Sequence, residues 1–137
     1  MIRKLDPSNA VPSMKIKKEK SILIIDDEKD LCMTIKDHFE DEGFEVYTAN
    51  SAEQGCDFVG RKHPTIVLLD ICLPDFNGLD FLAAIKKVWP NVIVFIVTGV
   101  HDTGLARRAM ELGAFDYITK PFSMQRLQTK WIDPIFN

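Results

Sequence analysis

Few cysteines and no long apolar run limit what this 137-residue chain can be. Its three cysteines, Cys32, Cys56 and Cys72, are odd in number and form no Cys-x-x-Cys pair or Cys/His cluster, which argues against a disulfide framework or a zinc site. We therefore expect reduced thiols in the core of a cytoplasmic protein. No apolar run approaches the roughly 20 residues that span a bilayer, and the N-terminus lacks the apolar segment of a secretory signal. We thus expect no membrane partner.

Basic charge is concentrated at the N-terminus. Residues 1–20 hold six basic and two acidic residues, a net charge of +4, whereas the whole chain is at −3 and the remainder therefore at −7. A basic arm can bind nucleic acid, but this one has no aromatic residue to stack on bases and contains Pro7 and Pro12. We expect residues 1–19 to be a mobile basic tail, residues 20–137 to form one domain, and no direct nucleic-acid binding.

Strand-like and helix-like segments alternate five times after the tail. The runs 21–25, 66–69 and 92–97 are apolar and rich in β-branched residues, as in strands buried on both faces of a parallel sheet. The runs 44–48 and 115–119 are more mixed, so we place them at the edges. Amphipathic helices are predicted over about 31–39, 51–61, 79–89, 103–112 and 123–133. In the second of these helices, we expect Ala52, Cys56 and Val59 to face inward. This alternation predicts an α/β fold, a flavodoxin-like doubly wound five-stranded parallel sheet of order 2-1-3-4-5 with helices on both faces.

Polar side chains follow four of the predicted strands. Asp26 and Asp27 come after the first strand, Asp70 after the third, Thr98 at the end of the fourth, and Lys120 after the fifth. Each has an ordinary structural explanation, such as capping a helix or closing a turn. Because the carboxyl ends of parallel strands share one edge of the sheet, where ligand sites lie, their joint occurrence favours a functional site.

The chemistry of such a cluster follows from its charges. Carboxylates packed together raise one another's pKa, and Mg²⁺ relieves the repulsion where phosphate oxygens can complete its shell. Asp70 is then a candidate nucleophile that carries a phosphoryl group. Mg²⁺ and Lys120 would neutralise the phosphoryl oxygens. The Thr98 hydroxyl can donate to one of those oxygens only when the phosphoryl group is present, which would bias a two-state loop.

Four motifs together resemble the receiver domain of bacterial response regulators over about residues 20–132. They are Ile24-Ile25-Asp26-Asp27-Glu28, the run 69–78 (Leu-Asp-Ile-Cys-Leu-Pro-Asp-Phe-Asn-Gly), Val97-Thr98-Gly99, and Tyr117-Ile118-Thr119-Lys120-Pro121-Phe122. The resemblance implies that Asp70 is the phosphoacceptor and that Asp27 is a direct Mg²⁺ ligand. Asp26 would act nearby or through water, and the backbone carbonyl of Cys72 would be a further ligand.

The same resemblance implies a switch and its partners. Thr98 and Tyr117 resemble the pair in which the hydroxyl moves to the phosphoryl group and the ring turns inward, and the Lys120–Pro121 peptide is expected to be cis. The phosphoryl group would come from a sensor histidine kinase or a phosphotransfer protein in a two-component phosphorelay. The domain would catalyse only its own phosphoryl transfer and autodephosphorylation, and an unidentified downstream protein or output domain would read it. We expect a short last helix, because Pro134 ends it.

Other functions fit the residues less well. A flavodoxin-like nucleotide or FMN binder needs a phosphate-cradling loop after the first strand, where this chain has Asp26-Asp27-Glu28. A haloacid-dehalogenase-type phosphatase resembles Asp-x-Asp, but Cys72 stands at the second acidic position. Two alternatives stay open: an interaction module that works without phosphorylation, and the excised receiver of a larger regulator.

Overall fold

The computed structural model describes residues 19–137. The predicted basic tail, residues 1–19, therefore lies outside the described residues except for Glu19. Within residues 19–137, no helix combines the length and the apolar character needed to cross a membrane.

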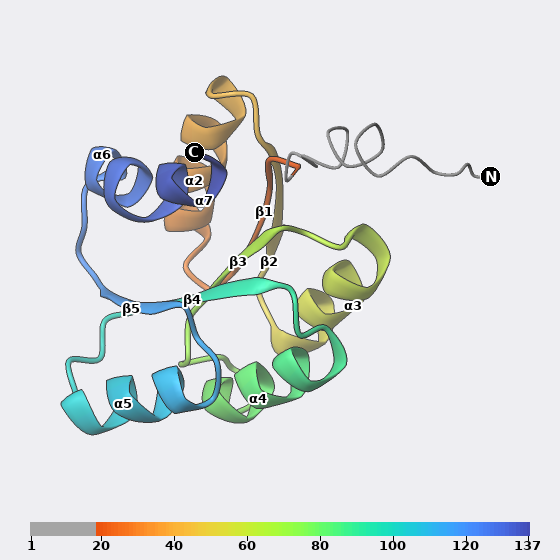
Figure 1. Ribbon diagram of the computed structural model, residues 1–137, viewed down its shortest axis with the longest axis vertical. Coiled ribbons are helices and arrows are strands. Elements are labelled where there is room, and N and C mark those ends of the chain that lie inside the picture. Colours follow the sequence, from red (N-terminus) through yellow and green to blue (C-terminus); the bar gives the residue numbers. More distant parts are fainter. Residues whose placement is uncertain (1–18) are drawn as a thin grey trace, which may run out of the picture.

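Residues 19–137 form one parallel sheet of five strands in the order β2-β1-β3-β4-β5, which confirms the predicted fold and strand order (Figure 1). The strands are β1 (Ser21–Ile25), β2 (Glu45–Ala49), β3 (Ile66–Leu69), β4 (Ile93–Thr98) and β5 (Asp116–Thr119). The three apolar strands lie in the centre, where both faces are buried, and the mixed strands β2 and β5 form the edges.

Helices cover both faces of the sheet (Figure 1). On one face lie α3 (Ala52–Lys62), α4 (Gly78–Val88) and α5 (Thr103–Glu111). On the other lie α2 (Lys29–Asp41) and the C-terminal helical segment, which consists of α6 (Met124–Arg126), the π-helix η1 (Leu127–Ile132) and α7 (Asp133–Phe136). The helices α2, α4 and α5 each connect two neighbouring parallel strands, whereas α3 connects β2 to β3 across β1, and the C-terminal segment follows the last strand.

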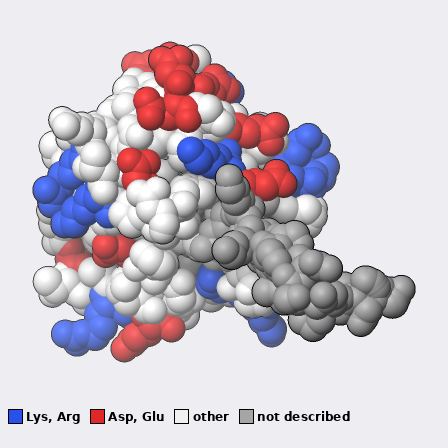
Figure 2. Space-filling view, turned by 45° about the horizontal axis from the view of Figure 1, so that its top comes forward, with Lys and Arg blue, Asp and Glu red and all other residues white. Residues whose placement is uncertain are grey.

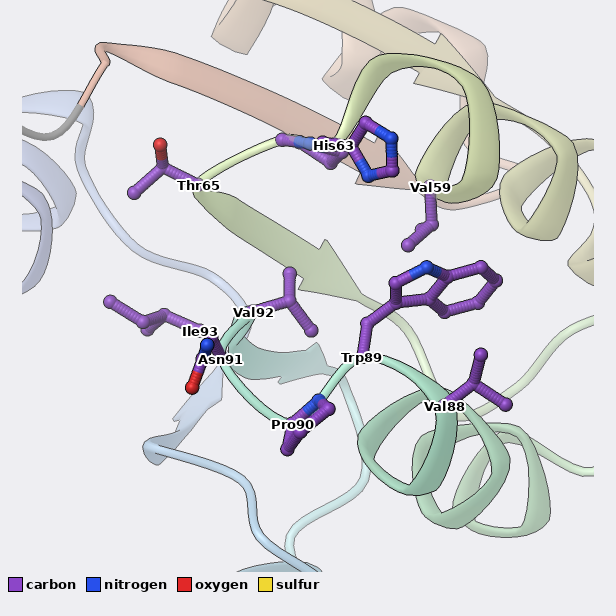
Figure 3. A pocket seen from close by; sticks show the side chains of 10 residues that line it. Val59, His63, Thr65, Val88, Trp89, Pro90, Asn91, Val92 and Ile93 are labelled. Carbon is purple, nitrogen blue, oxygen red and sulfur yellow. The ribbon is translucent and has the colours of Figure 1, made fainter. Parts of the chain in front are cut away.

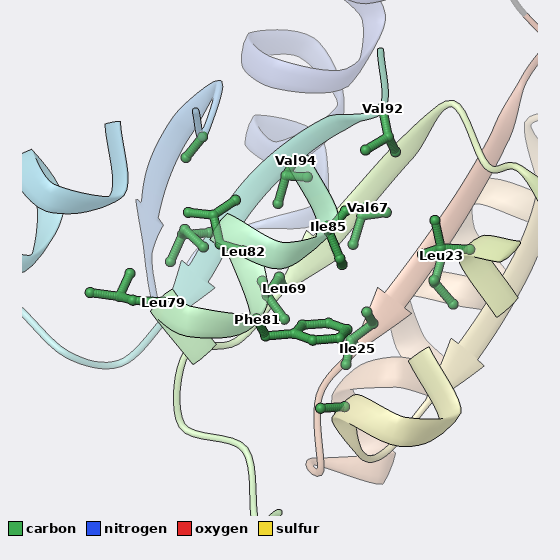
Figure 4. Close-up of a cluster of buried hydrophobic side chains, with 14 of the residues drawn as sticks. Leu23, Ile25, Val67, Leu69, Leu79, Phe81, Leu82, Ile85, Val92 and Val94 are labelled. Atoms are coloured by element: carbon green, nitrogen blue, oxygen red, sulfur yellow. The ribbon is translucent and has the colours of Figure 1, made fainter. Parts of the chain in front are cut away.

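The sheet has one apolar core on each face. Each central strand contributes to both cores, because successive side chains point to opposite faces. In β1, Leu23 and Ile25 join the core under α3 and α4, which Figure 4 shows. Ile22 and Ile24 join the second core, under α2 and η1. The central strands are thus packed on both faces, and their carboxyl ends position the residues that follow.

The start of α3 is capped from two directions. The Ser51 hydroxyl accepts a hydrogen bond from the Gln54 amide at 3.2 Å, as a capping box predicts. The Gln54 side chain accepts from the Asn50 amide rather than from that of Ser51. Asp75, in the loop after β3, places its carboxylate on the amides of Ala52 and Glu53 at 2.9 and 3.2 Å. The Ala52 amide is the main cause of the lowered pKa of Asp75. This loop is thereby fixed to α3.

The position of Cys56 differs from the prediction. Cys56 is exposed, and Gly55 faces the core in its place. A Cβ atom on Gly55 would lie 2.5 Å from the Ile25 Cδ1 atom, so a larger residue at this position would require the Ile25 side chain to shift. Cys72 is also exposed, and of the three cysteines, all within the described residues, only Cys32 is in the core.

The end of the last helix also differs from the prediction. Helical structure continues beyond Pro134 to Phe136. Pro134 occupies the first turn of α7, where a missing amide proton and a fixed φ are tolerated. The continuation lets Phe136 pack on Phe44, with 5.4 Å between the ring centroids.

Candidate functional site

Main-chain hydrogen bonds extend the sheet past its strands and fix the predicted site residues. The Asp26 amide donates to Ala49, and the Asp70 amide donates to Ile25. The Lys120 amide donates to the Thr98 carbonyl at 2.8 Å. The structure thus brings together the residues that the sequence places after four separate strands.

Three carboxylates meet at this edge. Asp26, Asp27 and Asp70 each offer one oxygen, and these oxygens all lie within 4.8 Å of one another. Asp26 and Asp70 are buried, at 3% and 6% exposure, whereas Asp27 is exposed. One oxygen of Asp26 accepts from the Glu28 amide at 2.9 Å, and one of Asp70 accepts from the Cys72 amide at 3.0 Å.

The Lys120 ammonium contacts the carboxylates of the cluster. Its Nζ donates to Asp26 Oδ2 at 2.8 Å, to Glu28 Oε1 at 2.8 Å and to Asp70 Oδ2 at 3.1 Å. Burial opposes its charge, but the hydrogen bonds to the three carboxylates outweigh burial and raise the pKa of Lys120 above its usual value. The surrounding carboxylates therefore favour the charged form of Lys120.

Burial has the larger effect on Asp26. It raises the pKa of the Asp26 carboxyl, and hydrogen bonds from Lys120 and from the Glu28 amide offset the rise only in part. The nearby Asp70 raises it further. Four carboxyl groups, counting Glu28, lie at this edge, and three of them contact the Lys120 ammonium, so the cluster favours additional positive charge.

The donor set suits a hard divalent cation. A carboxylate has about four lone-pair positions. Asp26 and Asp70 each accept two hydrogen bonds from the described residues, which leaves lone pairs for a metal ion. A few carboxylate oxygens beside space for water are the ligands that Mg²⁺ prefers. The roles of Asp27 as direct ligand and of the Cys72 carbonyl stay predictions.

The two residues predicted as a switch are joined through Val100. Thr98 is fully buried, and its hydroxyl oxygen accepts from the Val100 amide at 3.4 Å. The Tyr117 hydroxyl donates to the Val100 carbonyl at 2.8 Å. Burial raises the pKa of the Tyr117 phenol, which keeps this donor protonated. The main chain of Val100 is thus hydrogen-bonded to both side chains.

The loop between β3 and α4 is held tightly around the acceptor candidate. The Gly78 amide donates to the Ile71 carbonyl at 3.1 Å, and a Cβ atom on Gly78 would lie only 2.2 Å from the Ile71 Cα atom.

The Lys120–Pro121 peptide bond, directly after β5, is cis.

Sequence reasoning missed two contacts of the site. It did not assign Glu28 to Lys120, although Glu28 belongs to the acidic run after β1. It also missed Asp75 as the cap of α3, since that contact joins residues more than twenty positions apart.

One hollow in the described structure lies away from the carboxylates. It has a volume of about 450 Å³ and is lined by residues of 59–65 and 88–93. Figure 3 shows His63 and Trp89 bordering it, beside the segments that lead into β3 and β4. It therefore lies at the amino ends of the strands, opposite the acidic site, and its described lining contains no carboxylate.

Charges are mixed on the face that Figure 2 shows. Acidic side chains gather at the top of that view. Elsewhere on the described part of this face, basic and acidic side chains are interspersed. This part of the surface has no continuous basic area of the kind that binds nucleic acid.

Comparison with known proteins gives one family. The family model described as "Response regulator receiver domain" matches residues 22–131. The chain is 30% identical over 107 residues to sporulation initiation phosphotransferase F of Bacillus subtilis, covering 78% of this chain and 86% of that protein. It is 36% identical over 108 residues to the nitrogen assimilation regulatory protein NtrX of Azorhizobium caulinodans, covering 77% of this chain and only 24% of that longer protein.

Solved structures agree with this result. A CheY-like response regulator receiver domain protein from Methanospirillum hungatei superposes with a TM-score of 0.81 at 30% identity. The match covers 86% of this chain and 94% of that one.

Proposed function

This chain belongs to the response regulator receiver domain family, and on that premise we propose that it is a phospho-accepting signalling switch. Receiver domains of this family interact with histidine kinases or phosphotransfer proteins. We infer that such a partner donates a phosphoryl group to Asp70. The observation that carries the proposal is the Lys120 ammonium, 3.1 Å from the buried Asp70 carboxylate inside an acidic cluster.

In the proposed transfer, a carboxylate oxygen of Asp70 attacks the phosphorus of the donor. A bond forms between that oxygen and phosphorus, and the bond from phosphorus to the donor's imidazole nitrogen breaks. The nitrogen leaves with the electron pair. Asp70 needs no base, since a carboxylate is already a nucleophile. The main-chain bond from the Asp70 amide to Ile25 and the Cys72 amide on its side chain hold the acceptor in place.

Charge neutralisation is the main task of the surrounding residues. Lys120 would donate to a phosphoryl oxygen from its present position beside Asp70. Asp26, Asp27, Asp70 and the Cys72 carbonyl would hold Mg²⁺, with Asp27 as a direct ligand and Asp26 acting nearby or through water. When bound, this ion neutralises negative charge on the phosphoryl oxygens.

The response would begin at Thr98. A phosphoryl oxygen would attract its hydroxyl, which would then leave the Val100 amide. Because the Tyr117 hydroxyl donates to the carbonyl of the same residue, a shift of Val100 also changes the position of the Tyr117 ring. A downstream protein, or an output domain on a longer chain, would read the altered surface around Tyr117.

The test is intact mass after incubation with Mg²⁺ and acetyl phosphate. We expect wild type to gain one phosphoryl group and Asp70→Asn to gain none while its circular dichroism spectrum stays unchanged. Asp80→Asn, which removes an exposed carboxylate from the start of α4, is the matched control and should be phosphorylated like wild type. Undiminished incorporation in Asp70→Asn, or none in folded wild type that binds Mg²⁺, would contradict the proposal.

A further inference from the structure

The hydrogen-bond donors of Lys120 are fully used. An ammonium group has three N–H donors, and Lys120 directs them to Asp26, Glu28 and Asp70. The three partners differ in exposure. The side chains of Asp26 and Asp70 are 3% and 8% exposed, whereas that of Glu28 is 62% exposed. A new acceptor near Lys120 can be satisfied only if one of these three gives way.

The Glu28 carboxylate contacts Lys120 and does not cap the helix α2. Glu28 is the N-cap residue of α2, and its side chain accepts no hydrogen bond from the first turn of that helix. Its main chain is fixed, because its amide donates to Asp26 and its carbonyl accepts from the Cys32 amide at 3.1 Å. The carboxylate instead reaches across the site to Lys120 at 2.8 Å.

We propose that Glu28 is a positioning residue that occupies Lys120 in the unphosphorylated state and is displaced by the phosphoryl group. This inference rests on the proposed function of Asp70. A phosphoryl group on Asp70 brings new anionic oxygens beside the ammonium. Asp26 would have to leave a buried contact, which is costly. Asp70 becomes the acyl phosphate itself, and its phosphoryl oxygens take the place of its carboxylate beside Lys120. Glu28 can turn to water, where an exposed ion pair contributes little. Glu28 therefore regulates how readily Asp70 accepts phosphate.

The sign of the effect follows from two contributions that agree. Glu28→Gln weakens the contact that must be broken, and it removes a negative charge that would repel the phosphoryl oxygens. The strength of exposed ion pairs corresponds to about a two- to fivefold gain in phosphorylation. One contribution opposes the gain, because a lost carboxylate weakens Mg²⁺ binding. Measurements at saturating Mg²⁺ remove this opposing effect.

The control is Asp30→Asn. Asp30 is an exposed carboxylate two residues further along, in the first turn of α2, and within the described residues it makes no ion pair with Lys120. Both variants lose one negative charge near the site, but only Glu28→Gln loses the contact. A difference between them therefore reports the contact and not the general field.

The experiment compares the 137-residue wild-type chain with both variants. Phosphorylation rates come from intact mass at saturating Mg²⁺ and limiting acetyl phosphate, and urea unfolding checks that all three are folded. Two binding titrations accompany them: Mg²⁺ alone, and beryllofluoride, a tetrahedral mimic of the phosphoryl group, at saturating Mg²⁺. We expect Glu28→Gln to be phosphorylated about two- to fivefold faster and to bind beryllofluoride more tightly while binding Mg²⁺ more weakly. A residue that only supported the fold would not move these two affinities in opposite directions.

The outcomes separate this inference from the proposed function. Equal behaviour of Glu28→Gln and Asp30→Asn, or slower phosphorylation of Glu28→Gln at saturating Mg²⁺, overturns the role of Glu28 while the phosphoacceptor role of Asp70 stands. Failure of the wild type itself to take up phosphate overturns the proposed function, and the role of Glu28 with it.

Discussion

Replacing Lys120 with methionine removes the one ammonium that the structure places among the carboxylates of the site within residues 19–137. Its partners Asp26 and Asp70 are buried, and removing one partner of a buried ion pair costs about 3–5 kcal/mol. The exposed Glu28 contact adds less than about 1 kcal/mol. Because the Lys120 side chain is itself 15% exposed, water reduces the penalty. We expect Lys120→Met to lose about 2–4 kcal/mol of unfolding free energy when divalent cations are removed.

Urea unfolding in EDTA, followed by far-ultraviolet circular dichroism, measures this loss. The control is Lys36→Met, which removes an ion pair to Glu40. The side chain of Lys36 is 31% exposed and that of Glu40 is 44% exposed. It should cost about 1 kcal/mol or less. Added Mg²⁺ should restore more stability to Lys120→Met than to wild type, because the variant has the more negative site. Equal losses in the two variants would refute the reasoning.

The pH dependence of the same variant gives an independent check. A carboxyl whose pKa is raised by folding stabilises the fold below its unfolded-state pKa, and this contribution is lost as the pH rises through the folded-state pKa. Burial already raises the pKa of Asp26 in wild type, and Lys120 partly offsets that rise. Without Lys120 the pKa should rise further. Lys120→Met should therefore recover stability as the pH falls from neutrality toward the ordinary carboxyl pKa in EDTA, more than wild type does. A pH-independent deficit would contradict this account.

Two further predictions concern the loop after β3 and the thiols. Gly78→Ala places a Cβ atom 2.2 Å from the Ile71 Cα atom, so it should cost roughly 1–3 kcal/mol in urea unfolding and weaken Mg²⁺ binding, whereas Gly99→Ala, with no atom within 4 Å, should be tolerated. Equal effects of the two substitutions would argue against a tightly held loop. Cys56 and Cys72 should react with Ellman's reagent within the native state, whereas Cys32 should react only on unfolding, since burial raises its pKa to about 11. A third rapidly reacting thiol in the native protein would show that Cys32 is accessible.

The fold and the core of the site could be predicted because both depend on short-range sequence features. An apolar run ends where its strand ends, so Asp70 and Lys120 are adjacent in sequence to the edge of the sheet that they occupy. Parallel strands then bring their carboxyl ends together whatever the intervening helices contain. The contact of Glu28 with Lys120 depends instead on the direction of one long, exposed side chain. The periodicity of apolar residues in the sequence does not predict the direction of such a side chain.

The two helix predictions that were wrong share a physical cause. The predicted inward face of Ala52, Cys56 and Val59 has helical spacing. The observed face of Ala52, Gly55 and Val59 has helical spacing too, but a search for apolar side chains does not count glycine. Close approach of α3 to Ile25 decided between them. Pro134 was taken to end a helix, although proline in a first turn is compatible with helix. In both cases backbone packing, and not side-chain hydrophobicity, determined the outcome.

Val100 shows how far a motif can be correct and still omit the connection between its residues. The sequence marks Thr98 at the end of β4 and Tyr117 in β5. Their link is the amide and the carbonyl of one intervening residue, one hydrogen-bonded to each side chain. Because the amide and the carbonyl belong to the same residue, the proposed movement of the Thr98 hydroxyl toward Asp70 would alter the anchor of the Tyr117 ring without any contact between the two side chains. Since both bonds are to the main chain, the coupling does not require valine at this position, and the side-chain pattern of the loop therefore could not reveal it.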